Sequence, residues 1–192
     1  MSGQHMQLAD LISRAARTFG DAPALIQGRR NISFAEFDTV TDRLGTALLA
    51  RGLAPGDHVA VLVPNGIDGV VTYYALAKAG LVRVPLNARE TDVELAYKIV
   101  DSGSRALITD GRVPERTDIV IGTDELDTMI ASAPDGPCRV VRDPEAPLRL
   151  AYTGGTTGKP KAVILTTRSE LAEVANFLVD LLPNLCLLYT SP

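Results

Sequence analysis

The sequence has few of the residues that build metal centres and disulfide frameworks. Among its 192 residues there are two cysteines, two histidines and no tryptophan. Cys138 and Cys186 do not have metal-ligand spacing, and only His5 and His58 could join them. We therefore expect two ordinary thiols in a reducing compartment, with neither a zinc motif nor a disulfide scaffold.

Runs of like charge and long apolar runs are also absent. The formal net charge is −4, and no cluster of lysine and arginine occurs, which argues against nucleic acid as the main partner. No apolar run approaches the roughly 20 residues that cross a bilayer. The first five residues are polar and lack the apolar core of a signal peptide. We expect a cytoplasmic protein without an integral membrane segment.

Apolar residues recur with helical spacing in several segments, and short apolar runs separate them. The composition, 46% hydrophobic and 22% charged, is enough for a sizeable core in one or two domains. Helices are expected at residues 8–19, 34–51, 66–79, 92–102, 124–131 and 169–182. Strands are expected at residues 24–26, 31–32, 59–63, 81–84, 106–109 and 118–121, the first two forming a hairpin around Gly28.

Local signals fix several helix ends. Ser33 with Glu36, and Thr91 with Glu94, have the spacing of capping boxes. Asn65 is the expected cap of the helix at 66–79. The inward face of the helix at 92–102 is expected to carry Val93, Ala96, Tyr97 and Val100. Because strands and helices alternate at short spacing, the predicted class is α/β, with a mostly parallel sheet and flanking helices.

The last third of the chain changes character. Five prolines and glycines between residues 133 and 147 predict a connector. Pro183 is expected to stop the helix that begins at 169, and residues 185–189 have the composition of a core strand. We therefore expect a partial N-terminal domain over residues 1–182. We hypothesise that the polypeptide stops inside this domain, and that residues 183–192 are an atypical tail outside the natural sequence.

A glycine- and threonine-rich stretch at residues 153–161 stands between two apolar segments, 150–152 and 162–165, that read as strands. Glycine lets a backbone approach a ligand closely, and such a loop can direct several N–H groups at one anion. Threonine hydroxyls add donors and the lysines add positive charge. The chemistry that this stretch predicts is phosphate binding.

This stretch is not a Walker loop. Only three residues separate Gly154 from Gly158, and Lys159 is followed by Pro160 instead of by serine or threonine. Proline also disfavours the helical region for the residue before it. The loop is therefore expected to join two strands without capping a helix, which also disfavours a P-loop kinase.

Residues 152–161 resemble the AMP-binding signature of the adenylate-forming superfamily, which includes acyl-CoA synthetases, aryl-CoA ligases, adenylation domains and luciferases. Residues 32–37 and 76–87 resemble two further motifs of that family, in the same order. The chain departs from the pattern at Gly154, where serine is more frequent, at Ala162, where glycine is, and at Thr167, where the family has histidine. The resemblance covers residues 8–182, about the first third of such an enzyme.

The resemblance implies a two-step reaction. A carboxylic acid attacks the α-phosphorus of ATP to give an acyl-adenylate, and a thiol, usually that of coenzyme A, then takes the acyl group. Carried over by position, the residues that hold the β- and γ-phosphates would be Thr153, Gly154, Gly155, Thr156 and Thr157, with added charge from Lys161. Lys159 is expected to be a solvated loop residue.

The rest of the family's machinery is expected after residue 192. This includes the magnesium-binding glutamate, the adenine and ribose contacts, the catalytic lysine and most of the coenzyme A site. No catalytic residue and no metal ligand is therefore assigned within the chain, and the chain alone is predicted to be inactive. Neither the acyl substrate nor the oligomeric state can be predicted.

Three functions from different classes are consistent with the sequence. The first is part of a fatty- or aryl-acid CoA ligase. The second is an adenylation domain that loads a carrier protein. The third is a non-catalytic nucleotide-binding or interaction module, and the stretch at 153–161 could also be a hairpin without any ligand.

Overall fold

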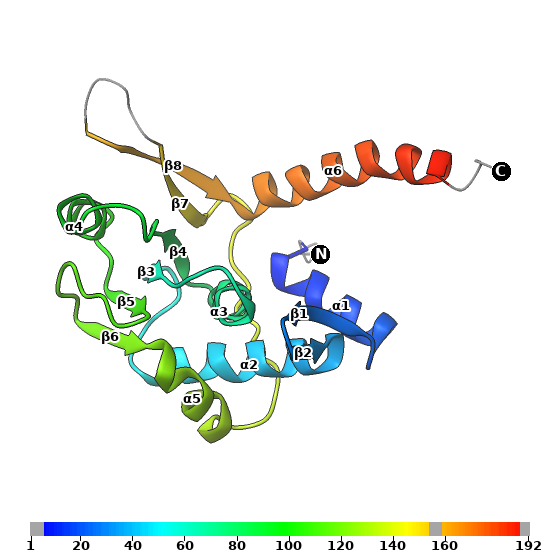
Figure 1. The fold of residues 1–192 in the computed structure, drawn as a ribbon, viewed down its shortest axis with the longest axis horizontal. Helices are drawn as coiled ribbons and strands as arrows, with labels where there is room; N and C mark the ends of the chain where they lie inside the picture. The colour runs from blue at the N-terminus through cyan, green and yellow to red at the C-terminus, as the bar shows by residue number, and fades with distance from the viewer. Residues whose placement is uncertain (1–5, 154–158, 189–192) are drawn as a thin grey trace.

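A computed structural model gives the fold of the chain (Figure 1). It describes residues 6–153 and 159–188, with the helix at 178–188 described by its backbone alone. Within these ranges the structure is an α/β domain, as the alternating pattern predicts.

The centre of the molecule is a six-stranded sheet in the order β6-β5-β3-β4-β7-β8. All neighbouring strands are parallel except β7 and β8, which are antiparallel, so the predicted mostly parallel sheet is confirmed. The strands are β3 (His58–Leu62), β4 (Val82–Pro85), β5 (Ala106–Thr109), β6 (Ile119–Gly122), β7 (Pro147–Thr153) and β8 (Lys161–Thr166).

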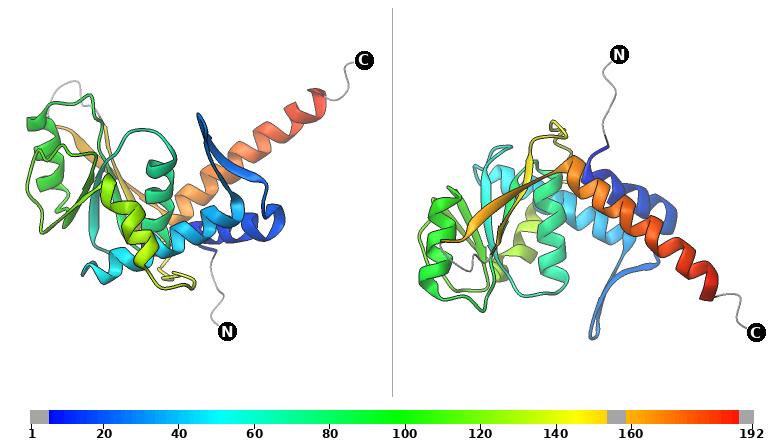
Figure 2. Two further views of the ribbon diagram at one scale, coloured as in Figure 1. Left: turned by 60° about the horizontal axis from the view of Figure 1, so that its bottom comes forward. Right: turned by 90° about the horizontal axis from the view of Figure 1, so that it is seen from above.

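Helices cover both faces of the sheet. The helices are α1 (Leu8–Phe19), α2 (Phe34–Ala50), α3 (Ile67–Lys78), α4 (Asp92–Asp101), α5 (Leu126–Ser132) and α6 (Thr167–Leu188), with a short 3₁₀ turn, η1 (Thr123–Glu125), before α5. Helices α2, α3 and α5 pack in one apolar cluster with β3, β5 and β6, and α1 lies outside them against α2 and α3. Helix α4 covers the opposite face, and α6 extends away from the body of the molecule (Figure 2).

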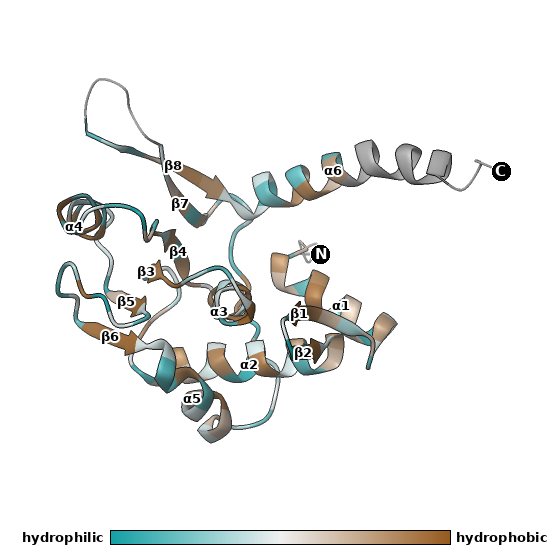
Figure 3. Ribbon diagram, viewed as in Figure 1, coloured by the Kyte–Doolittle hydropathy of each residue, from teal (hydrophilic) through white to brown (hydrophobic). Residues whose placement is uncertain are grey.

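Strand β3 shows why an unbroken apolar run marks a central strand. Val59 and Val61 contribute to the cluster under α2 and α3, whereas Ala60 and Leu62 contribute to the cluster under α4. Side chains alternate between the two faces of a strand, so a strand covered on both faces must be apolar throughout. Strand β3 accordingly appears hydrophobic in Figure 3.

The hairpin of β1 (Pro23–Gln27) and β2 (Arg30–Ser33) turns at Gly28, which has φ +60°. Its last β1 residue reaches α3: the backbone N–H of Ile67 donates to Gln27 Oε1 over 3.0 Å. The prediction that Asn65 caps α3 is therefore wrong. Gly66 is the N-cap residue, and it has no side chain that could cap the helix. The Gln27 side chain takes this role, and a Cβ at Gly66 would lie only 2.7 Å from its amide.

The predicted inward face of α4 is also wrong, although its Thr91–Glu94 capping box is present. Val93 is 80% exposed and Val100 is 66% exposed, whereas Leu95 and Ile99 are buried against β3 and β5. Two apolar stripes compete on this short helix. The sheet covers the stripe of Leu95 and Ile99, which has the larger aliphatic side chains, because burying this stripe removes more apolar surface from water.

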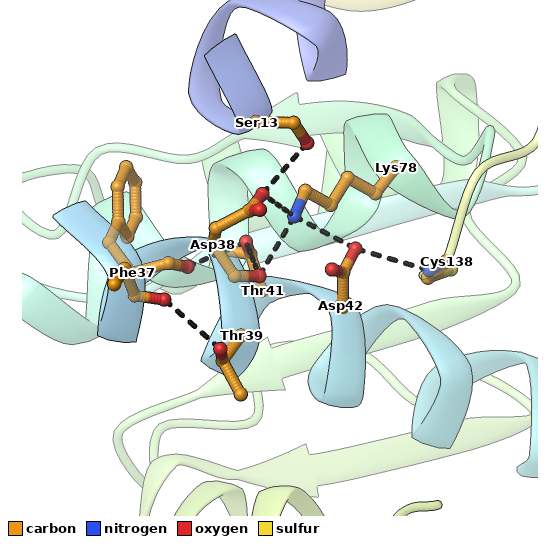
Figure 4. A network of polar contacts seen from close by, with 9 residues as sticks. Ser13, Phe37, Asp38, Thr39, Thr41, Asp42, Lys78 and Cys138 are labelled. Atoms are coloured by element: carbon orange, nitrogen blue, oxygen red, sulfur yellow. Dashed lines mark hydrogen bonds and ion pairs between the residues drawn. The ribbon is translucent and has the colours of Figure 1, made fainter. Parts of the chain in front are cut away.

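A buried ion cluster joins the helices on the other face (Figure 4). The side chain of Lys78 is 1% exposed, and its ammonium lies 2.6 Å from Asp38 Oδ1 and 2.8 Å from Asp42 Oδ1. Ser13 donates to Asp38 over 2.9 Å, and the backbone N–H of Cys138 donates to Asp42 over 3.1 Å. Side chains of α1, α2 and α3 and the backbone of the connector thus share one cluster.

The C-terminal segments agree with the predictions in part. Residues 133–146 contain neither helix nor strand, and within them Cys138 is a buried free thiol. The expected helix end at Pro183 and the expected strand at 185–189 are wrong, because α6 continues through Pro183 to Leu188. Proline removes one backbone hydrogen bond from a helix, but its φ remains compatible with helical geometry.

Candidate phosphate-binding site

Strands β7 and β8 form the two arms of the phosphate-loop hairpin, the hairpin of residues 147–166. They pair in antiparallel register up to Tyr152 opposite Ala162 and Thr153 opposite Lys161. The connecting residues 154–158, and with them the predicted ligands Gly154, Gly155, Thr156 and Thr157, lie outside the described residues. The structure therefore places the two ends of the predicted site, Thr153 and Lys161, side by side.

The hairpin leaves the sheet at the edge where ligands bind in α/β folds. Arg149 of β7 pairs in parallel with Arg83 of β4, so β7 ends at the same edge as β3, β4 and β5. At this carboxyl edge, connections that leave neighbouring strands toward opposite faces open a crevice. The connection after β3 leads to α3 on one face, and the connection after β4 leads to α4 on the other.

A cavity of about 360 Å³ occupies that crevice. Its walls include Asn65 and Gly66 after β3, Pro85 and Leu86 at the end of β4, and Tyr73 from α3. The volume falls in the range of small-molecule pockets. A hollow site thus lies on the same edge of the sheet as the phosphate-loop hairpin.

Helix α4 supports the outer half of the hairpin. The hydroxyl of Tyr152 donates to Asp101 Oδ2 over 2.7 Å, and the hydroxyl of Tyr97 donates to the carbonyl of Pro160 over 3.3 Å. Burial, and then the hydrogen bond to Asp101, raise the pKa of Tyr152 well above its usual value. These contacts were missed from the sequence, in which Tyr97 was expected to face inward.

The two lysines of the hairpin differ in their surroundings. The ammonium of Lys159 lies 5.4 Å from the centre of the Tyr97 ring, a cation–π contact on an exposed residue. Lys161 is exposed, and in the part of the chain that the structure describes no carboxylate lies within ion-pair distance of it. Its ammonium can therefore interact with an anion near the last residue pair of the hairpin, Thr153 and Lys161.

The hydroxyl of Thr153 contacts the opposite strand of the hairpin. It lies 3.4 Å from the carbonyl oxygen of Lys161, a long hydrogen bond across the last pair of the ladder. Thr153 is exposed, so this hydroxyl could exchange that contact for a phosphate oxygen. The donor groups and the free positive charge at the end of the hairpin suit the phosphate tail of a nucleotide.

No group of three or more histidine, cysteine and acidic side chains within ranges 6–153 and 159–188 could hold a metal ion. No helix there has the length and apolarity required for a membrane span.

Fold and site together define an α/β domain with a glycine- and threonine-rich hairpin at the carboxyl edge of its sheet. The sequence matches the family model of AMP-binding enzymes over residues 12–189, so the chain belongs to the AMP-binding family. This confirms the resemblance that the sequence of the hairpin suggested.

Known members of the family are similar to this chain. A feruloyl-CoA synthase of Amycolatopsis is 34% identical over 87% of the chain and 35% of its own length. A fatty acid–[acyl-carrier-protein] ligase of Streptomyces coeruleorubidus is 30% identical over 88% of the chain and 35% of its own length. The chain thus spans about a third of the length of these curated relatives.

A solved structure, the N-terminal domain of FACL13 from Mycobacterium tuberculosis in its inhibitor-bound form, matches the fold. The TM-score is 0.78 at 28% identity, over 85% of this chain and 45% of the other. The α/β fold of this chain therefore matches the N-terminal domain of an adenylate-forming enzyme.

Proposed function

We propose that the phosphate-loop hairpin binds the β- and γ-phosphates of ATP in an enzyme that activates a carboxylic acid. The acid would form an acyl-adenylate with release of pyrophosphate, and coenzyme A would then accept the acyl group. The observation that carries this proposal is the pairing of Thr153 with Lys161, which holds the ends of the glycine- and threonine-rich stretch together at the carboxyl edge of the sheet.

The chemistry of this step depends on charge. Pyrophosphate leaves as a multiply charged anion, so groups that neutralise its charge in place stabilise the transition state. In the proposal Lys161 and the hydroxyls of Thr153, Thr156 and Thr157 contact the phosphates, and the backbone of Gly154 and Gly155 allows their close approach. Magnesium, coenzyme A and the acid would be held mainly by residues beyond this chain.

Binding of inorganic tripolyphosphate to the 192-residue chain, measured by calorimetry at low salt, tests the loop directly. Lys161→Ala should weaken binding by at least about tenfold, because a charge-assisted contact to phosphate is worth about 1.5–3 kcal/mol. Lys159→Ala is the matched control and should change the affinity less, because Lys159 contacts the Tyr97 ring. Equal loss in both variants, or no binding by the unmodified chain, would contradict the proposal.

Catalysis is tested by ATP–pyrophosphate exchange with a panel of aliphatic and aromatic acids. We propose that the chain alone supports no exchange, and clear turnover would contradict this. A carrier-protein-loading adenylation domain remains the second candidate, because one relative is named as an acyl-carrier-protein ligase. Transfer of the acyl group to coenzyme A or to a carrier protein in the longer enzyme would distinguish the two acceptors.

A further inference from the structure

Four polar side chains meet at the base of the phosphate-loop hairpin, where β7 joins β4, and neither the sequence patterns nor the proposed reaction accounts for them. They are Tyr73 from α3, Arg83 from β4, Arg149 from β7 and Glu170 from α6. They line a cavity of about 430 Å³ together with Leu8, Val174 and Phe177.

The two arginines carry like charges that repel each other in this cluster. Arg83 and Arg149 are register partners on neighbouring parallel strands, so two positive charges lie side by side. The Arg83 guanidinium carbon is 3.7 Å from the centre of the Tyr73 ring, and Nε of each arginine is buried without a hydrogen-bond partner among the described residues. Burial lowers the pKa of Arg83, because removal from water disfavours its charged form.

Glu170 supplies the counter-charge. It is 8% exposed, and its Oε1 lies 2.7 Å from the Arg149 guanidinium, an ion pair without hydrogen-bond geometry. Its Oε2 accepts a hydrogen bond from the Tyr73 hydroxyl over 2.9 Å. Glu173 also lines the cavity, but it is exposed. Glu170 is therefore the buried carboxylate between the arginines and α3.

The positions of these residues in the chain connect the cluster to the hairpin. Arg149 lies four residues before Thr153, the last residue of β7. Glu170 lies four residues after Thr166, the last residue of β8, in the first turn of α6. Strand β7 is joined to β4 through a single register pair, Arg83 opposite Arg149. Beside this pair, Leu150 of β7 packs in one buried cluster with Val82 and Val84 of β4, so side-chain contacts add to the attachment of the hairpin to the parallel sheet.

We propose that Glu170 is a positioning residue, which clamps the base of the phosphate-loop hairpin to β4 and α3 by neutralising Arg83 and Arg149. This inference rests on the proposed function for its consequence in phosphate binding. The clamp itself is a structural proposal that does not depend on that function. Loss of the carboxylate would leave two adjacent cations, and their repulsion would loosen β7 from β4.

Hydrogen exchange of the 192-residue chain tests the clamp, with Glu170→Gln as the principal variant. Exchange at the amides of β7 and β8 should accelerate roughly tenfold relative to the amides of β3, which serve as an internal reference for global opening. Glu173→Gln removes a carboxylate from the same helix and cavity, and should leave the exchange unchanged.

The double variant Glu170→Gln/Arg83→Met separates electrostatic clamping from packing. Removing one cation should restore slow exchange in β7 and β8, whereas a merely structural role predicts additional loss. This variant also keeps the test decisive should Glu170→Gln fail to fold. Unchanged exchange in Glu170→Gln, or no rescue in the double variant, would overturn the clamp.

Tripolyphosphate affinity provides the functional readout. Glu170→Gln should raise the dissociation constant about fivefold, and the double variant should recover most of that loss. If the unmodified chain does not bind tripolyphosphate while the exchange pattern is as expected, the proposed function fails and the clamp stands. If binding is normal and exchange is unaffected by Glu170→Gln, the clamp fails and the proposed function stands.

Discussion

Lys78 is the most completely buried charged residue of the described chain, and its environment predicts a large effect of its removal. In Lys78→Met the carboxylates of Asp38 and Asp42 would face each other without a counter-ion, while their hydrogen bonds to Ser13 and Cys138 remain. Breaking a buried pair from one side costs about 3 kcal/mol or more of unfolding free energy. Urea denaturation followed by circular dichroism measures this loss.

The surface pair of Arg30 and Asp68 provides the matched control. Its side chains are 49% and 45% exposed, so Arg30→Met should lower the free energy of unfolding by less than about 1 kcal/mol. Similar losses in the two variants would show that the Lys78 cluster contributes no more than a solvated ion pair.

At the residue scale the sequence predicted that Thr153 and Lys161 lie at the two ends of one loop, and it predicted little of what surrounds them. The glycines and threonines of 153–161 form a local pattern, so they can be identified by inspection. The cluster of Tyr73, Arg83, Arg149 and Glu170 is assembled from four elements, and no sequence spacing marks it. Side chains that meet only through the register of β4 and β7 cannot be paired before that register is known.

Helix α2 lies close to α3 and to the connector at Gly45, and the packing there predicts the effect of adding one methyl group. A Cβ at Gly45 would lie 2.8 Å from Cys138 Sγ and 3.1 Å from the Ala75 carbonyl oxygen. Gly45→Ala should therefore destabilise the protein by about 1–3 kcal/mol through overpacking. This should occur although alanine favours a helix by about 1 kcal/mol over glycine. Thermal or urea unfolding measures the change.

The same substitution in a Cys138→Ala background tests the stated cause. Removing Sγ takes away the nearest obstacle, so the additional cost of Gly45→Ala should be smaller there than in the unmodified chain. An equal cost in both backgrounds would mean that the Ala75 backbone, and not the connector, limits the space at Gly45.

At the element scale, features whose partners are close in the sequence were predicted correctly. Features that depend on a segment distant in the sequence were not. The capping boxes at Ser33 and Thr91 are present because both partners belong to one helix turn. The cap of α3 comes from Gln27 in the preceding hairpin, which only the folded chain brings near. The inward stripe of α4 was misassigned because the sheet, not the helix, decides which apolar stripe is covered.

At the scale of the whole molecule, the α/β class and the strand–loop–strand hairpin followed from the alternation of short patterns and from the phosphate-loop residues. The strand order did not follow, because it depends on which neighbours each strand finds. That order places β8 at one edge of the sheet, with β7 as its neighbour on one side. The consequence is a hydrophobic edge strand: Val163 is 45% exposed and Ile164 is 59% exposed.

An exposed apolar edge strand offers unpaired backbone groups to a second chain. We therefore expect the 192-residue chain to self-associate at micromolar concentrations, and Ile164→Lys to shift it toward the monomer, because a charge on an edge strand opposes pairing. Sedimentation velocity over a concentration series measures the shift. Val174→Lys on α6, where the residue is 38% exposed, is the control for apolar surface outside the sheet. A shift in Val174→Lys without one in Ile164→Lys would place the association on α6 and contradict edge pairing.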